Sequence, residues 1–476
     1  MAYTPTIGLE IHAELNTRTK MFCSSKNDAD ETKPNVNICP VCLAHPGVLP
    51  VINREAVKHV LKVGVALGGT LADYTEFDRK NYFYPDLPKG YQLSQYEFPL
   101  VSGGNLCGVE ITRVHLEEDT ASSLHSEESG TTVIDYNRSG VPLMELVTEP
   151  VIKSAEQAGK FAKELQLLLR TLGVSDANME KGEMRVEANV SVAKDGGLGT
   201  KVEIKNLNSF RAMERAVEYE IKRQSELLEK GERIAQETRG WDEAKQSTFP
   251  QRTKEGSADY RYFPDPDLPS LKLSLVSEFS KSSIQKEMPE LPGARRERYL
   301  GLGLKMEEAN ILAENPALGV LFDATIMAPL PGITAQLTAN YLTNDLLNII
   351  RDLDSRGAQQ SHEMPISAQN LAKIISMVSQ GKVSSRVAKD LLRSTVVEGV
   401  DPEVMASEQG LLKLEGADKL SAIVEGALKE HPGVVNDYRN GKAAALEFLV
   451  GQGMKATKGA ADPDALREIF VKKIAG

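Results

Sequence analysis

Hydrophobic and polar residues alternate strictly in the first predicted element of the chain. Residues 7–14 divide into two sets, Ile7, Leu9, Ile11 and Ala13 on one side and Gly8, Glu10, His12 and Glu14 on the other. A period of two is typical of a strand that is buried on one face. The polar face of this strand offers two carboxylates and an imidazole in a row. Taken alone, such a row is more often an ordinary exposed face, but similar acidic segments recur later in the chain.

The same reasoning predicts many strands up to about residue 290, interrupted by two helices. One helix is expected over residues 154–172, where Ser154 is a suitable N-cap and Gly173 a stop signal. The other is expected over residues 210–230. Strand patterns therefore dominate this part of the chain, and its helices are exceptions.

From about Pro289 onward, helical periods replace the strand pattern. A helix that begins after Ser367 and stops at Gly381 has its apolar residues on one face. A further unit, helical throughout, begins near Ser407. Two to four domains are expected, as the length of 476 residues also indicates.

Composition narrows the class of protein. The chain has 41% hydrophobic and 26% charged residues, which is ordinary for a soluble globular protein. It has no apolar run of membrane-spanning length and no secretory signal, and its four cysteines do not suggest a disulfide scaffold. A cytoplasmic protein with no membrane partner is therefore expected.

The net charge of −11 argues against a uniformly basic nucleic-acid binder, so any contact with RNA must use a local patch. One candidate patch lies near the C-terminus and comprises Arg439, Lys442, Lys455 and Lys458. A basic face on a small helical unit suits an RNA backbone. A solvated helix face is an equally good interpretation of these residues.

Carboxylates form the main chemical signal of the strand-rich region. Besides Glu10 and His12, the candidates at strand-like positions are Glu117, Glu118, Glu145 and Glu187. If they converged, each close pair would repel by ~4 kcal/mol at an effective dielectric near 20, so the cluster would need a cation. Oxygen ligands with one imidazole suit Mg²⁺ or Mn²⁺ better than zinc. The alternative is that these acids lie on separate surfaces and pair with lysines and arginines.

No glycine-rich phosphate loop is present, so a nucleotide would have to be bound through metal, lysine and arginine. Residues 77–92 are rich in aromatic and basic side chains, among them Lys80, Tyr82 and Lys89. Such a mixture can stack a base and contact phosphate, although it can also simply brace a loop. A second candidate lies where Lys205, Asn206 and Ser209 precede a helix, because a helix N-terminus can take a phosphate.

Three cysteines have the spacing of a metal knuckle. Cys39 and Cys42 form a Cys-x-x-Cys motif, and Cys23 lies sixteen residues upstream of Cys39. Three thiolates and one more ligand would make a structural zinc site, but no fourth cysteine follows closely. The sequence also contains no Gly-x-Ser-x-Gly motif and no serine-rich stretch of the amidase type.

These residues lie in motifs that resemble, in order and almost from end to end, the B subunit of the tRNA-dependent aspartyl/glutamyl amidotransferases, the GatB/GatE family. The resemblance is carried by residues 8–12, 77–86, 115–119, 184–191, 205–210, 236–239, 259–264 and 448–452. It implies an α+β fold with an antiparallel-sheet cradle over residues 1–290. A helical domain over 291–405 and a small helical tail domain over 406–476 would follow.

The resemblance also implies an activity, that of a carbon–nitrogen ligase with glutamine as amido donor. The side-chain carboxylate of Glu or Asp on misacylated tRNA would be phosphorylated by ATP, and ammonia would then displace the phosphate. An amidase-type glutaminase subunit would supply the ammonia, and a small linker subunit would complete a heterotrimer. The helical domain and the tail would hold the tRNA.

By the same resemblance, Mg²⁺ is held or surrounded by Glu10, His12, one or both of Glu117 and Glu118, Glu145 and Glu187. Lys80, Tyr82 and Lys205 are expected near ATP, substrate or an ammonia tunnel. The chain departs from the family pattern at two places. Ser25 replaces a cysteine, which puts zinc binding in doubt, and residues 119–123 replace the more common Glu-Asp-Ala-Gly-Lys motif.

Two other functions fit some of the same residues. One is a non-catalytic RNA-binding scaffold that keeps a relic metal site, and it would tolerate loss of the carboxylates. The other is a metal-dependent hydrolase, which would turn over without tRNA or ATP. The intact acidic set favours the amidotransferase subunit over both.

Overall fold

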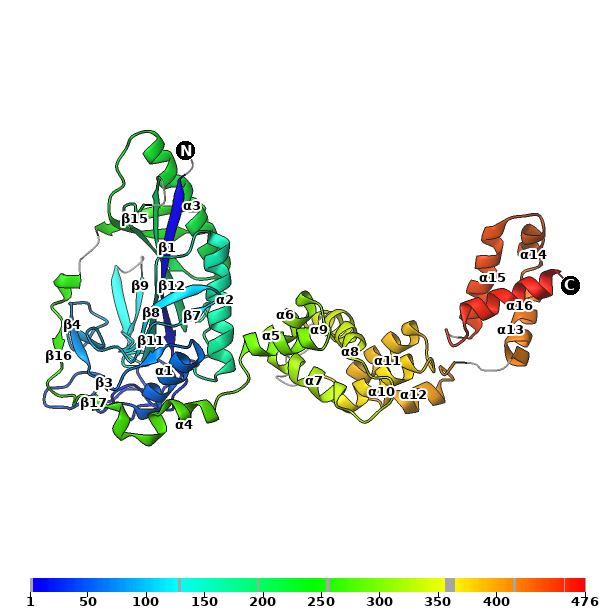
Figure 1. The fold of residues 1–476 in the computed structure, drawn as a ribbon, viewed down its shortest axis with the longest axis horizontal. Helices are drawn as coiled ribbons and strands as arrows, with labels where there is room; N and C mark the ends of the chain where they lie inside the picture. The colour runs from blue at the N-terminus through cyan, green and yellow to red at the C-terminus, as the bar shows by residue number, and fades with distance from the viewer. Residues whose placement is uncertain are drawn as a thin grey trace. The chain divides into compact units, whose positions relative to one another are not determined.

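The computed structural model describes residues 3–126, 130–194, 197–253, 257–355, 364–413, 417–457 and 459–475. The chain divides into two compact units, Met1–Leu291 and Pro292–Gly476. The first unit contains the strands and the second is helical (Figure 1). The predicted α+β class is therefore confirmed.

A ten-stranded sheet forms the centre of the first unit, in the order β15-β14-β13-β12-β1-β11-β8-β6-β2, with β7 paired to β8. Its long central strands are β1 (Thr4–Glu14), β8 (Val109–Glu118), β11 (Pro142–Thr148) and β12 (Met184–Ala193). The remaining strands are β2 (Thr70–Leu71), β6 (Val101–Ser102), β7 (Asn105–Leu106), β13 (Val202–Leu207), β14 (Glu237–Asp242) and β15 (Ser247–Thr253). β1 thus lies between two strands that come more than a hundred residues later.

Every neighbouring pair in this sheet is antiparallel except one. β13 and β14 are parallel because α3 (Phe210–Glu229) connects them and returns the chain to the same end of the sheet. The predicted antiparallel sheet is therefore present, with this one parallel pair within it.

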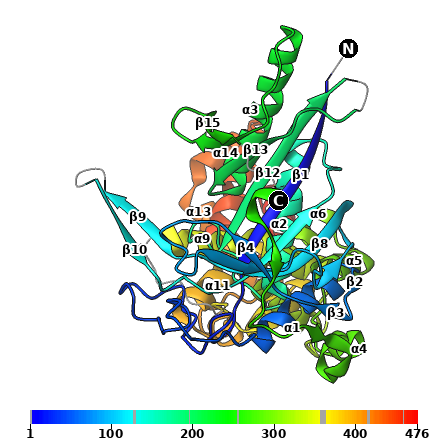
Figure 2. The same cartoon turned by 90° about the vertical axis from the view of Figure 1, so that its left-hand side faces the viewer.

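Three small sheets complete the strands of the first unit. The first has the order β16-β4-β5, with bounds Phe263–Pro264, Asp78–Asn81 and Tyr91–Ser94. The second is a hairpin of β9 (Ser122–Ser126) and β10 (Thr131–Asp135), which extends away from the large sheet in Figure 2. The third pairs β3 (Tyr74–Thr75) with β17 (Leu271–Lys272), and short 3-10 turns lie at η1 (Ser257–Tyr260), η2 (Leu273–Leu275) and η3 (Ser277–Phe279).

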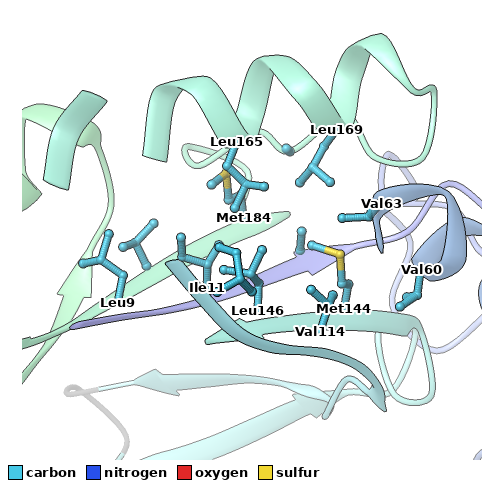
Figure 3. Packing of buried hydrophobic residues seen from close by; sticks show 14 of the residues in the cluster. Leu9, Ile11, Val60, Val63, Val114, Met144, Leu146, Leu165, Leu169 and Met184 are labelled. Atoms are coloured by element: carbon cyan, nitrogen blue, oxygen red, sulfur yellow. The ribbon is translucent and has the colours of Figure 1, made fainter. Parts of the chain in front are cut away.

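One face of the large sheet forms the hydrophobic core. α2 (Ala155–Thr171) covers it with Leu165 and Leu169, which lie over Ile11 and Leu146 (Figure 3). α1 (Arg54–Ala66) contributes Val60 and Val63 to the same core, and α4 (Lys281–Lys286) contributes Ile284. Because the apolar set of β1 is buried here, its polar set faces the opposite side of the sheet.

Both helices predicted in this region are present. Ser154 caps α2 by accepting a hydrogen bond from the backbone N–H of Gln157. Ser209 caps α3 by accepting one from Ala212. Each serine thereby satisfies a backbone donor that the first turn would otherwise leave without a partner.

The second unit consists of helices around two separate hydrophobic cores. The helices are α5 (Pro292–Gly301), α6 (Met306–Glu314), α7 (Pro316–Ile326), α8 (Ala335–Asn340), η4 (Tyr341–Leu346, a π-helical turn), α9 (Leu347–Ser355), α10 (Ala368–Ser379), α11 (Ser385–Glu398), α12 (Pro402–Glu408), α13 (Ala417–Glu430), α14 (Pro432–Arg439), α15 (Ala443–Ala456) and α16 (Pro463–Ala475). One core draws its buried residues from Tyr299 to Ala406, and the other from Leu420 to Ile474. None of the helices described in either unit is both long and apolar enough to cross a bilayer.

Candidate functional site

The register of the central strands brings acidic and imidazole side chains to one face of the sheet. Glu10 of β1 lies directly opposite Glu187 of β12, and His12 lies opposite Glu145 of β11. Glu145 in turn lies opposite His115 of β8. Residues directly opposite in an antiparallel pair project to the same side, so these side chains gather on the polar face of β1.

The side chains lie close to one another. The Nε2 atom of His12 lies 3.4 Å from Oε2 of Glu145 and 3.9 Å from Oε1 of Glu10. The Nε2 atom of His115 also lies 3.4 Å from Oε2 of Glu145. Glu117 completes the group, because its Oε1 lies 3.9 Å from His12 and 3.7 Å from His115. We call Glu10, His12, His115, Glu117, Glu145 and Glu187 the acidic pocket.

Within the described chain, Glu117 is the member of the acidic pocket with the most buried side-chain oxygens that lack a hydrogen-bond partner. Its side chain is 1% exposed, and neither carboxylate oxygen accepts a hydrogen bond from any residue that the structure describes. Within the same part of the chain, the Nδ1 atom of His115 is likewise buried without a partner. A buried ionised carboxylate without hydrogen bonds is strongly unfavourable unless a charge neutralises it. The pocket therefore has the features of a site that binds a cation.

Three basic side chains offset part of the negative charge. Lys205 donates a hydrogen bond of 2.9 Å to Glu187, and the Nζ atom of Lys80 lies 3.7 Å from Glu117. Arg113 lies 3.5 Å from Glu145. Both oxygens of Glu117 and one oxygen of Glu187 still lack a hydrogen-bond partner among the described residues.

The crowding of charges changes the proton affinities of the pocket. Burial raises the pKa of Glu10 to about 7, and the neighbouring carboxylates of Glu145 and Glu187 add to this. Burial lowers the pKa of His12, but the adjacent Glu145, then Glu10 and Glu187, outweigh that and raise it to about 9. Without a metal, protons therefore take up part of the role of a cation here.

Glu118, predicted together with Glu117, is not brought into the acidic pocket. Successive strand residues point to opposite sides, so Glu118 turns away from its neighbour. It pairs with Lys89 at 2.5 Å and accepts a hydrogen bond from the backbone N–H of Leu93. Lys89, predicted to bind ATP or substrate, is therefore occupied by this ion pair.

The remaining predicted nucleotide ligands lie around β4 and before α3. Lys80 is on β4, and Tyr82 follows it and donates a hydrogen bond to Gln92. Asn206 is exposed and has a left-handed backbone with φ of 63°. The Ser209 hydroxyl oxygen accepts the capping hydrogen bond of α3, which leaves its O–H able to donate to a phosphate.

The basic residues predicted for the tail belong to α14, the start of α15 and its last turn. Arg439 donates to the backbone carbonyl of Ile474, and Lys442 pairs with Asp437 at 3.0 Å. Lys455 lies in the last turn of α15. Lys458 lies outside the described residues.

The three predicted knuckle cysteines do come together. The sulfur atoms of Cys23, Cys39 and Cys42 all lie within 4.8 Å of one another. The hydroxyl of Ser25 lies 3.8 Å from the sulfur of Cys42. Structural zinc takes four nitrogen or sulfur ligands, so three thiols and a serine hydroxyl leave the ligand set incomplete.

His115 belongs to the acidic pocket and Arg113 contacts its Glu145, but neither was predicted as a site residue. A signal for both was present, since residues 111–117 alternate and place Arg113, His115 and Glu117 on one face. Reading that alternation from Glu117 backwards would have found them.

Two family models match the chain, one within each compact unit. A family model described as the GatB/GatE catalytic domain matches residues 5–277, and one described as the GatB domain matches residues 322–474. The chain is 46% identical to the B subunit of the aspartyl/glutamyl-tRNA(Asn/Gln) amidotransferase of Thermus thermophilus, over 99% of both chains. It is 41% identical to the same subunit from Thermoanaerobacter pseudethanolicus over the whole of both chains, and 40% identical to that of Gloeothece citriformis over 99% of this chain and 98% of the relative.

Proposed function

This chain belongs to the GatB/GatE family, and from that premise we propose that it is the ligase subunit that amidates misacylated tRNA. Its substrates would be Glu-tRNA(Gln), Asp-tRNA(Asn) or both. The single observation that carries the proposal is the acidic pocket, in which the buried Glu117 accepts no hydrogen bond from the described residues on either oxygen. A cluster of this kind is suited to binding a divalent cation together with a phosphorylated ligand.

The proposed reaction has two steps. The side-chain carboxylate of the esterified Glu or Asp attacks the γ-phosphorus of ATP, which forms an acyl phosphate and releases ADP. Ammonia then attacks the acyl carbon, the C–O bond to the phosphate breaks, and inorganic phosphate leaves. The first step gives a poor electrophile a good leaving group, and the second forms the side-chain amide.

Magnesium fits the donor set of the acidic pocket. Carboxylate oxygens are the ligands that Mg²⁺ prefers, and Glu10, Glu117 and Glu145 would hold it together with His12. Glu187 lies beside Glu10 as a fourth carboxylate. When bound, the ion would neutralise the charge on the transferring phosphoryl group.

The side chains around the pocket would position the reactants. Lys80 and Lys205 flank it and would attract the negatively charged phosphates and the substrate carboxylate. His115 contacts Glu117 and Glu145 and would keep the two carboxylates in place. The basic residues only partly offset the acids, so the site would select a ligand that brings its own cation.

We further propose that the chain works with a glutaminase partner of the amidase type and a small linker subunit. The sequence lacks the amidase motifs needed to release ammonia from glutamine. The helical second unit, with Arg439, Lys442, Lys455 and Lys458, would contact the tRNA backbone. Shape and local contacts would then suffice for RNA recognition despite the acidic net charge.

The test is amide formation on Glu-tRNA and Asp-tRNA by the reconstituted complex, with ammonium and Mg-ATP but without glutamine. The variants are Glu145→Gln and, as a matched control, Glu149→Gln. Glu149 follows β11 and accepts a hydrogen bond from Thr112, outside the acidic pocket. ATP-dependent activity that is lost only in Glu145→Gln supports the proposal. Equal activity of the two variants would contradict the proposal and favour a non-catalytic scaffold. Hydrolysis of the amide or the ester without ATP would favour a hydrolase.

A further inference from the structure

Five tyrosine rings form a continuous group beside the acidic pocket. Tyr82 and Tyr84 follow β4, Tyr96 follows β5, and Tyr260 and Tyr262 precede β16. The ring centroids of successive members lie between 4.3 and 6.1 Å apart. We call these five residues the tyrosine wall.

Hydrogen bonds hold the two distant segments of the wall together. β16 pairs with β4, so residues 260–264 are fixed against residues 78–81. The side-chain amide of Asn81 donates to the backbone carbonyls of Tyr260 and Arg261. The backbone N–H of Tyr96 donates to the carboxylate of Asp78. The wall is therefore a built surface, and its shape does not depend on ring contacts alone.

The tyrosine wall is not part of a hydrophobic core. None of its five rings belongs to the buried clusters found among the described residues. Tyr84 is 51% exposed and Tyr96 is 45% exposed. Tyr96 stacks on Tyr262 with an interplanar angle of 12°, which covers one face of its ring. The surface of Tyr96 that remains exposed is where a third flat ring could extend the stack.

One lysine connects the wall to the acidic pocket. The Nζ atom of Lys80 lies over the ring of Tyr260 at 5.3 Å and 3.7 Å from Glu117. An anionic group at Lys80 would thus lie between the carboxylates on one side and the aromatic rings on the other. A ligand that joins a flat ring to a phosphate or carboxylate would fit here, because its ring could contact the tyrosines while its anionic group contacts Lys80.

We propose that the tyrosine wall stacks an adenine ring, with the exposed face of Tyr96 as the platform. This rests on the proposed function, whose two substrates both carry an adenosine: ATP, and the tRNA end to which the amino acid is esterified. Base stacking on aromatic side chains tolerates any base and needs no hydrogen-bond readout. Stacking of this kind needs only the aromatic rings and the lysine that this surface provides, and no glycine-rich phosphate loop.

The proposal is tested by fluorescence of 2-aminopurine, which stacking on an aromatic ring quenches. One probe is 2-aminopurine riboside triphosphate, and the other is an RNA minihelix with 2-aminopurine at its 3′ end. Each is titrated with the full chain and Mg²⁺. The variants are Tyr96→Leu, which removes the ring, Tyr96→Phe, which keeps it, and Phe83→Leu, which removes an 80% exposed ring outside the wall.

The expected result is quenching of at least one probe by the wild type, Tyr96→Phe and Phe83→Leu. Tyr96→Leu should weaken its binding roughly 5- to 150-fold, the range for loss of one stacked base. Quenching of the triphosphate alone identifies the base as that of ATP, and quenching of the minihelix alone identifies the 3′ end. No quenching of either probe by the wild type, or unchanged binding by Tyr96→Leu, overturns the proposal. Because no turnover is needed, quenching without amidation would instead count against the proposed function.

Discussion

His12 and Glu145 lie directly opposite each other across the β1–β11 ladder, and Nε2 of the imidazole is 3.4 Å from Oε2 of the carboxylate. The two residues are 133 positions apart in the sequence, so only the pairing of the strands makes them neighbours. The same oxygen of Glu145 is equally close to His115 on the next strand. Glu145 of β11 therefore contacts a side chain from each of its two neighbouring strands, β1 and β8, within the acidic pocket.

His115 is expected to act as a positioning residue for the two carboxylates that it contacts. His115→Gln should leave the first unit folded but weaken Mn²⁺ binding by about 10- to 100-fold, as loss of a supporting contact to metal ligands usually does. An electron paramagnetic resonance titration with Mn²⁺ measures the affinity without turnover. His59→Gln, which changes another buried histidine of the same unit, should bind Mn²⁺ like the wild type. Equal affinity in the two variants would mean that His115 has no part in the pocket.

His59 of α1 should make the chain less stable in acid. Burial lowers its pKa to about 4, whereas the unfolded chain has the ordinary value of 6.5. Between these values the unfolded state binds more protons, so this contribution is complete above pH 6.5 and is lost as the pH falls toward 4. The free energy of unfolding in urea should therefore fall more steeply for the wild type than for His59→Gln over this window. Parallel curves for the two proteins would contradict the assignment.

The cysteine knuckle should bind zinc weakly as it stands. Cys23, Cys39 and Cys42 provide three thiols, and the serine hydroxyl beside them is a poor zinc ligand. Ser25→Cys should supply the fourth thiol, and the variant should then retain one zinc ion through treatment with a chelator that strips the wild type. Cys107→Ser, which removes an exposed thiol elsewhere, is the control and should leave the zinc content unchanged. Equal retention by wild type and Ser25→Cys would show that the hydroxyl does not limit the site.

Sequence alternation predicted the polar face of β1 because a period of two is a local property. It could not show that β11 and β12 flank β1, since strand order depends on which distant segments pair. The convergence of Glu10, His12, Glu145 and Glu187 therefore stayed open until the register was known. Glu117 and Glu118 could not be separated for the same reason, because the face that each presents depends on the neighbours of β8.

Residues that act through a neighbour were harder to predict than the acids themselves. His115 shares a strand face with Glu117, yet nothing local to it indicates that Glu145 of another strand also contacts it. The tyrosine wall combines residues 82–96 with residues 260–262, and only the pairing of β4 with β16 joins them. In contrast, the two long helices of the first unit followed from serine caps and apolar spacing, because those signals lie within the helices.

Phosphoryl transfer in the acidic pocket is the central claim, and it is tested most directly without ammonia. The complex is given Glu-tRNA, Mg-ATP and hydroxylamine, which traps an acyl phosphate as the hydroxamate of the side chain. The wild type should form one hydroxamate and one ADP per trapped substrate, and omission of ATP should abolish both products. Glu117→Gln should form neither, whereas Glu149→Gln should behave like the wild type. Hydroxamate formation by Glu117→Gln at the wild-type rate would contradict the account.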